Sequence, residues 1–129
     1  GYYNDPDKTA EVIRDGWLCT GDLARFTEKG LLKILGRRDG LIIRAGMNIY
    51  PQEIEAALKA DARVRELYVR GKKDAHDRTQ IVLHIAGAFA DTAEVRAMCR
   101  ARLPAFQVPN EICLTDELPK NGSGKIIRR

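Results

Sequence analysis

Apolar residues in the middle of the chain recur at helical spacing. Ile54 and Leu58 lie four residues apart on one face, which predicts an amphipathic helix that begins at Pro51. Proline suits the first position of a helix, because the N–H that it lacks has no partner there in any case. Glu53 and Glu55 are expected in the first turn, where the helix dipole favours negative charge.

A second helix is predicted between Asp91 and Pro104. Asp91, followed three residues later by Glu94, is a variant of the capping box that opens many helices. Pro104 ends the pattern, since proline cannot continue a helix. The apolar face of this helix comprises Val95, Met98, Cys99 and Leu103.

Short apolar runs bounded by turn residues predict strands around these helices. Leu23–Phe26 and Leu31–Leu35 flank a turn that ends in Gly30, which is the signature of a β-hairpin. The other runs are Trp17–Thr20, expected to be buried, Leu41–Arg44, Glu66–Val69, Gln80–Ile85 and Ile112–Leu114. We therefore predict an α+β fold: a small sheet of a few strands with helices packed against it, preceded by a β-hairpin.

The composition is that of a folded protein and excludes several classes. Hydrophobic residues make up 44% and charged residues 31% of the 129 residues, as in an ordinary soluble globule. No apolar run approaches the roughly 20 residues that span a bilayer, so no membrane span is expected. A net charge of +4 without a concentrated basic stripe disfavours nucleic acid as a partner. The polar start from Gly1 to Pro6 lacks an initiator Met, and we expect a piece of a longer chain.

The cysteines predict neither a disulfide framework nor a zinc site. Cys19, Cys99 and Cys113 are odd in number and have no CxxC spacing. All three lie among apolar neighbours and are expected to be packing residues. This usage fits a reducing compartment, so we expect a cytoplasmic protein, and we expect no metal ligands in this chain.

The glycine-rich segment near the C-terminus superficially resembles a P-loop. A P-loop places a glycine five residues before Gly124 and a hydroxyl residue directly after Lys125. Pro119 and Ile126 occupy these two positions. Both requirements fail, so the segment is not a P-loop, although Lys125 behind a glycine turn remains suited to an anionic group.

Three motifs follow one another in a fixed order: Thr20–Leu23 (TGDL), Gly36–Asp39 (GRRD) and Pro119–Lys125 (PKNGSGK). Together they resemble the C-terminal part of the adenylate-forming superfamily, which comprises acyl- and aryl-CoA synthetases, nonribosomal-peptide adenylation domains and luciferases. The resemblance covers nearly the whole chain. It implies that residues 1–36 end a large N-terminal domain and that residues 37–129 form a mobile C-terminal lid.

The resemblance also implies a two-step reaction. In this family a carboxylate attacks the α-phosphate of ATP to give an acyl-adenylate and pyrophosphate, and a thiol then displaces AMP. The parent enzyme is expected to be an AMP-forming acid–CoA ligase that needs ATP, Mg²⁺ and CoA. Its other partners would be a carboxylic acid and the N-terminal domain that this chain lacks. The isolated chain is therefore expected to be inactive.

Five positions match residues with roles in the family. Lys125 matches the lysine that bridges the carboxylate and the α-phosphate, and it is the expected catalytic residue. Asp22 matches the acceptor of the ribose hydroxyls, and Arg37 resembles the arginine that reaches ATP phosphate or ribose. Asp39 matches the hinge about which the lid rotates. Gly46 matches the glycine of a loop that lines the pantetheine tunnel after rotation.

The chain departs from the family pattern at two positions. Many CoA ligases have a second glycine where this chain has Ala45, and an acidic residue often stands at the position of Gly40. The latter change removes any salt bridge that the second acid would make and loosens the expected hinge. His84 lies within an apolar strand and is interpreted as a structural histidine rather than a base.

Two alternative functions remain open from the sequence. An adenylation domain would hand its acyl group to the phosphopantetheine of a carrier protein, but the sequence from Asn48 to Glu55 resembles the acyl-CoA synthetase version of this segment and favours CoA. A nucleotide- or RNA-binding module would use the basic tail as its footprint. Aromatic residues make up only 6% of the chain and offer few stacking surfaces, which disfavours that module.

Overall fold

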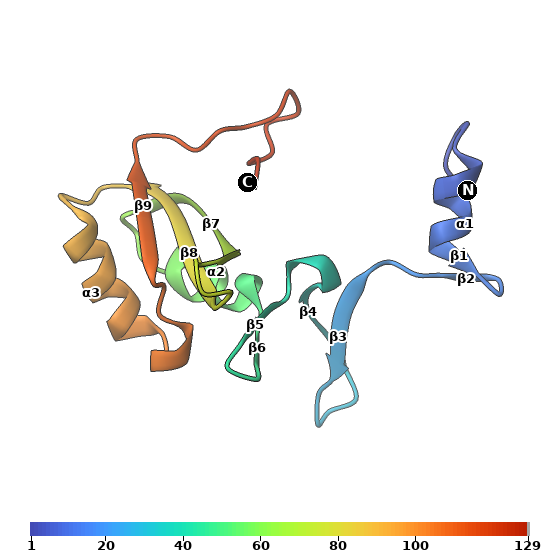
Figure 1. Cartoon of the computed structure of the whole chain (residues 1–129), viewed down its shortest axis with the longest axis horizontal. Helices are drawn as coiled ribbons and strands as arrows, with labels where there is room; N and C mark the ends of the chain where they lie inside the picture. The colour runs from blue at the N-terminus through green and yellow to red at the C-terminus, as the bar shows by residue number, and fades with distance from the viewer. Residues whose placement is uncertain (129) are drawn as a thin grey trace. The chain divides into compact units, whose positions relative to one another are not determined.

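The structure of the chain is a computed structural model that describes residues 1–128 (Figure 1). Arg129, the last residue of the basic tail, lies outside the described residues. The chain forms two compact units, which meet in sequence between Asp39 and Gly40. This division lies close to the boundary expected after residue 36, and each unit is described by itself below.

The first unit opens with a short helix that the sequence analysis missed. Helix α1 spans Pro6–Val12, and strands β1 (Ile13–Arg14) and β2 (Trp17–Leu18) follow as a small antiparallel pair. The side chain of Asp5 accepts a hydrogen bond from Lys8 N at 2.9 Å and so caps the helix. The Asp-Pro pair was the available signal, because it combines a capping residue with proline at the first helical position.

The prediction of a buried strand at Trp17–Thr20 is wrong in two respects. The strand covers only Trp17 and Leu18, and these side chains are 79% and 64% exposed. Their apolar character predicted burial, yet none of the described residues covers them.

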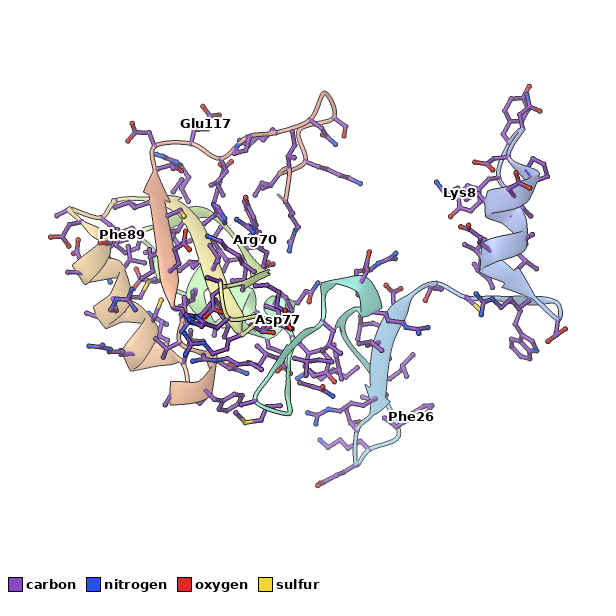
Figure 2. All side chains as sticks on the ribbon, in the orientation of Figure 1. Lys8, Phe26, Arg70, Asp77, Phe89 and Glu117 are labelled. Atoms are coloured by element: carbon purple, nitrogen blue, oxygen red, sulfur yellow. The ribbon has the colours of Figure 1, made fainter. Side chains whose placement is uncertain are left out.

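The predicted hairpin is confirmed. Strand β3 (Asp22–Phe26) pairs antiparallel with β4 (Leu32–Arg37), and Asp22 lies opposite Arg37 at the open end. Near the turn Phe26 is 75% exposed and projects from the ribbon (Figure 2). The hairpin therefore presents apolar side chains that no described residue covers.

The second unit is built on a three-stranded sheet in the order β7-β8-β9. Strands β7 (Val64–Lys73) and β8 (Thr79–Gly87) are antiparallel, and β9 (Glu111–Thr115) adds parallel to β8. β7 and β8 are longer than predicted, since pairing continues through polar residues such as Lys72 and Lys73. Apolar runs marked only the buried middle of each strand.

A short hairpin precedes the sheet in sequence. The short 3₁₀ turn η1 (Arg38–Gly40) leads into β5 (Ile42–Arg44), which pairs with β6 (Met47–Ile49). The sequence analysis did not predict β6, which begins directly after the two-residue turn Ala45–Gly46.

Both predicted helices are confirmed. Helix α2 spans Pro51–Lys59 and α3 spans Thr92–Arg102, while η2 (Ala105–Gln107) is a short 3₁₀ turn. Asp91 caps α3 by accepting from Glu94 N at 2.9 Å. Glu55 does not belong to the first turn of α2; it is a buried side chain one residue beyond that turn.

The two helices and the base of the β5–β6 hairpin share one core with the sheet, which confirms the α+β fold. Cys99 is buried there as predicted, whereas Cys19 is exposed and Cys113 only half-buried, so the packing role predicted for Cys19 is wrong. None of the helices in the described part of the chain is both long and apolar enough to cross a membrane. The core residues are Ile42, Ile49, Ile54, Leu58, Leu67, Val69, Ile81, Leu83, Ile85, Val95, Met98, Cys99 and Leu103.

The carboxylate of Asp74 organises the turn between β7 and β8. It accepts from His76 N at 2.8 Å, from Arg78 N at 3.0 Å and from Gln80 Nε2 at 3.0 Å. The hydrogen bond from Arg78 N, together with those from His76 N and Gln80, lowers the pKa of Asp74 to about 2. The ionised form is thus favoured in the folded chain more than in the unfolded chain.

We predict that Asp74→Asn removes part of the acid dependence of stability. An unfolded aspartate has a pKa of about 3.9, so the contribution of Asp74 is present above about pH 4 and is lost as the pH falls to about 2. Urea unfolding followed by circular dichroism should show a difference between wild type and variant that shrinks over this range. Asp116→Asn is the control, because the structure gives that exposed side chain no hydrogen bond. A difference between wild type and Asp74→Asn that is the same at pH 5 and pH 2 would contradict the assignment.

Candidate functional site

The segment that carries Lys125 is a closed loop at the end of the chain. Lys120 and Ile126 form an antiparallel bridge at its base, and Gly124 adopts a left-handed φ of 78° at its tip. The side chain of Asn121 holds the loop from inside: Oδ1 accepts from Ser123 N at 3.1 Å, from Ser123 Oγ at 2.8 Å and from Lys125 N at 2.9 Å. The backbone of Lys125 is therefore fixed by its own loop.

The Lys125 side chain, in contrast, is free. It is exposed, and none of the described residues forms an ion pair or hydrogen bond with its ammonium group. The other two cations of the described tail, Lys120 and Arg128, are both paired with carboxylates. A single unpaired ammonium on a fixed backbone is suited to an anionic group that approaches from outside the unit.

Apolar contacts hold the loop base against the sheet. Leu118 is buried together with Tyr68 and Ala86, and Ile126 packs against them. Ile127 N donates to Pro119 O at 2.8 Å, so the two arms of the loop are joined next to this contact. In Figure 1 the tail leaves β9, turns at the loop and returns toward β7.

Two carboxylates receive the cations of the tail. Glu55 on α2 accepts from Arg128 Nη1 at 2.7 Å and from Arg128 Nη2 at 3.0 Å, a bidentate ion pair. Glu66 on β7 pairs with Lys120 Nζ, and hydrogen bonding from this ammonium lowers the pKa of Glu66. We call residues 120–126 the lysine loop. An ion pair thus joins the chain to the folded unit before this loop and after it.

The structure brings three of the expected site residues together in the first unit. Arg37 Nη1 donates to Thr20 O at 2.9 Å and lies 3.3 Å from Asp22 Oδ1, while Arg37 Nε lies 3.6 Å from Asp39 Oδ1. Asp22 keeps its second oxygen free of partners among the described residues. The cluster combines the carboxylate of Asp22, which can accept hydrogen bonds from hydroxyl groups, with the cation of Arg37. The side chains of Arg37 and Asp39 are both more than a third exposed.

The tip of the β5–β6 hairpin is a tight turn of two residues with left-handed backbone. Ala45 has a φ of 49° and Gly46 a φ of 77°. Glycine adopts this region at little cost, whereas alanine does not, so the departure at Ala45 places a side chain where the backbone favours glycine. A Cβ added at Gly46 would meet no atom within 4 Å, which leaves open space beside the backbone there.

His84 lies in an environment that favours its neutral form. Its ring stacks on Tyr68 with centroids 4.5 Å apart, and its Nε2 accepts from Arg70 Nε at 3.1 Å. Partial burial and, second, the charge of Arg70 lower the pKa of His84. These contacts support the structural role assigned to this residue. The described residues also contain no group of three or more His, Cys, Asp or Glu side chains placed to hold a metal ion.

The site residues divide between the units: Asp22, Arg37 and Asp39 belong to the first, and Gly46 and Lys125 to the second. Sequence reasoning missed the residues that hold the lysine loop. Asn121 carried a signal, since asparagine before Gly-Ser-Gly is typical of a turn closed by its own side chain. The ion pairs of Glu55 and Glu66 left no signal in the sequence, because the partner of each lies more than fifty residues away along the chain.

The chain matches a family model described as the AMP-binding enzyme C-terminal domain over residues 53–125. It is 42% identical to a long-chain-fatty-acid–CoA ligase of Bacillus subtilis, with 100% of this chain and 24% of the relative covered. It is also 42% identical to a 2-succinylbenzoate–CoA ligase of Geobacillus kaustophilus, with 100% of this chain and 27% of the relative covered. The chain thus spans about a quarter of the length of these relatives.

Solved structures of related enzymes also match nearly the whole chain. The o-succinylbenzoate CoA synthetase of Bacillus subtilis, in complex with its acyl-adenylate intermediate, matches with a TM-score of 0.83 and 32% identity over 98% of this chain and 26% of that chain. An amide bond synthetase of Marinactinospora thermotolerans matches with a TM-score of 0.78 and 31% identity, at the same coverage.

We predict that Asn121→Ala makes the lysine loop mobile without unfolding the unit. The substitution removes three hydrogen bonds at once, so the heteronuclear ¹⁵N NOE of residues 122–125 should fall, while that of α3 stays unchanged. Ser123→Ala is the matched control, because it removes only the bond from Ser123 Oγ. Equal NOE values for the loop in wild type and Asn121→Ala would show that Asn121 does not fix it.

Proposed function

The chain belongs to the family of AMP-binding enzyme C-terminal domains, and on this premise we propose that it is the C-terminal part of an AMP-forming acid–CoA ligase. The observation that carries the proposal is the unpaired ammonium of Lys125 on a loop whose backbone and base are both fixed. The two CoA ligases that are 42% identical over the whole chain support the reaction class. The identity of the acid belongs to the part of the protein that precedes this chain.

Lys125 acts in the first half-reaction. When a carboxylate attacks the α-phosphate of ATP, negative charge builds up on the phosphoryl oxygens. A compact ammonium on a flexible side chain can meet that charge and hold the carboxylate beside it. The absence of a competing partner among the described residues leaves this ammonium available.

Asp22 and Arg37 act on the nucleotide. The second carboxylate oxygen of Asp22 can accept hydrogen bonds from ribose hydroxyls, while the first is held by Arg37. Arg37 orients the carboxylate of Asp22 through this contact and supplies a cation for phosphate or ribose. The contact between the two side chains supports a shared role for them at the nucleotide.

Asp39 and Gly46 act between the half-reactions. Asp39 is the last residue of the first compact unit, where a rotation of the second unit needs only a few backbone angles to change. Gly46 offers open space at a hairpin tip, which suits the close approach of a thin ligand arm such as pantetheine. Free CoA is proposed as the acceptor in preference to a carrier protein, because both relatives act on CoA.

The exposed apolar residues of the first unit support the partner that this proposal needs. Trp17, Leu18 and Phe26 are all more than 60% exposed, which is costly unless another surface covers them. We propose that the N-terminal domain of the same enzyme covers them. ATP would bind with Mg²⁺, which neutralises phosphate charge, and the described residues supply no ligand cluster for that ion.

We predict that Lys125→Ala in the full-length ligase abolishes the first half-reaction and spares the second. Loss of this contact should cost about 3 kcal/mol or more, which corresponds to a fall of at least roughly 100-fold in ATP–pyrophosphate exchange. Transfer of the acyl group from supplied acyl-adenylate to CoA should stay within about twofold of wild type.

Lys29→Ala, at an exposed lysine of the β3–β4 turn, is the matched control and should change neither rate. Wild-type exchange in Lys125→Ala would refute the proposed function. So would acyl-adenylate formation by the isolated chain, which lacks the expected N-terminal domain.

A further inference from the structure

Glu55 is a buried carboxylate whose hydrogen bonds come from two different parts of the chain. Its side chain is only 6% exposed. Oε1 accepts from Val69 N at 2.9 Å and from Arg128 Nη1 at 2.7 Å, and Oε2 accepts from Arg128 Nη2 at 3.0 Å. One contact fixes helix α2 to the edge strand β7, and the other two hold the end of the chain.

A carboxylate at this depth requires a cation. Burial removes the water that would solvate the charge, and the Val69 N–H alone does not compensate for that loss. Arg128 supplies the missing charge from only three residues beyond Lys125. Glu55 is therefore a binding site for the tail, and its carboxylate has no other cationic partner among the described residues when Arg128 is removed.

The lysine loop is held in the same way at its other end. Lys120 pairs with Glu66, and Leu118 N lies 3.5 Å from Glu66 Oε2. The loop is thus anchored by one ion pair before it and one after it, with the apolar contact of Ile126 between them. The ion pair that follows the loop is the more buried of the two, because the side chain of Glu55 is 6% exposed and that of Glu66 is 19% exposed.

We propose that Glu55 and Arg128 are positioning residues for Lys125, a clamp that fixes where the lysine loop stands. The inference rests on the proposed function of Lys125 and goes beyond it, since neither residue touches the reacting atoms. The clamp keeps the base of the loop in contact with the sheet, so the ammonium of Lys125 is confined to a small volume. A loss of position by about 1 Å costs roughly 100-fold in rate in such a reaction.

The two contacts of Glu55 can be separated by one substitution. In Glu55→Gln the amide oxygen can still accept from Val69 N, so α2 stays attached to β7. The amide group no longer offers a charge to Arg128, and its NH₂ would face the guanidinium. Glu55→Gln should therefore weaken the contact with Arg128 while it keeps the contact between α2 and β7.

The test uses Glu55→Gln, Arg128→Gln and Arg128→Lys in the full-length ligase. We expect the first two to lower the kcat of ATP–pyrophosphate exchange by roughly 10- to 100-fold. Transfer from supplied acyl-adenylate to CoA should stay within about twofold. Arg128→Lys should restore part of the lost exchange, because it keeps the charge. In the 129-residue chain, hydrogen exchange at Ile127 N should become faster in Glu55→Gln and Arg128→Gln.

Glu53→Gln on the same helix and Arg100→Gln on α3 are the matched controls, since the structure gives neither side chain an ion pair; both should behave as wild type. The inference is overturned if Glu55→Gln and Arg128→Gln leave exchange within about twofold of wild type. It is also overturned if they lower both half-reactions equally, or if hydrogen exchange at Ile127 is unchanged. Lys125→Ala separates the two claims: full activity in that variant refutes the proposed function itself, whereas its inactivity beside an active Glu55→Gln refutes only the clamp.

Discussion

The buried carboxylate of Glu55 is the interaction on which the arrangement of the second unit depends. It joins helix α2, the edge of the sheet and the end of the chain at one point, through Val69 N and the guanidinium of Arg128. A charge buried to this extent is stable only while all its partners are present. The carboxylate thus couples the position of the tail to the packing of α2 against β7.

The charges of the tail show a division of roles. Lys120 and Arg128 neutralise carboxylates on β7 and α2, while Lys125 between them neutralises nothing in the described chain. The Asn121 side chain fixes the backbone of Lys125 without touching its ammonium. This combination of a rigid base and an uncommitted cation agrees with a residue that meets its partner only during one half of a reaction.

The sequence predicted those features that depend on local chemistry. The periodicity around Ile54, the cap at Asp91 and the turn before Leu31 all determine structure within a few residues, and each prediction was confirmed. Burial could not be read in this way. Trp17 is apolar yet exposed and Glu55 is charged yet buried, because burial depends on distant surfaces. The candidate site shows the same limit. Motifs located Lys125, Asp22 and Arg37, whereas the ion pairs of Glu55 and Glu66 that hold the tail became evident only from the three-dimensional contacts.

The most direct test of this account is a double-mutant cycle between Glu55 and Lys125 in the full-length enzyme, measured as single-turnover formation of acyl-adenylate. If Glu55 acts only by placing the ammonium of Lys125, Glu55→Gln should slow wild type but have no further effect once Lys125 is alanine. A loss in the Lys125→Ala background as large as that in wild type would contradict the account, because Glu55 would then act by another route.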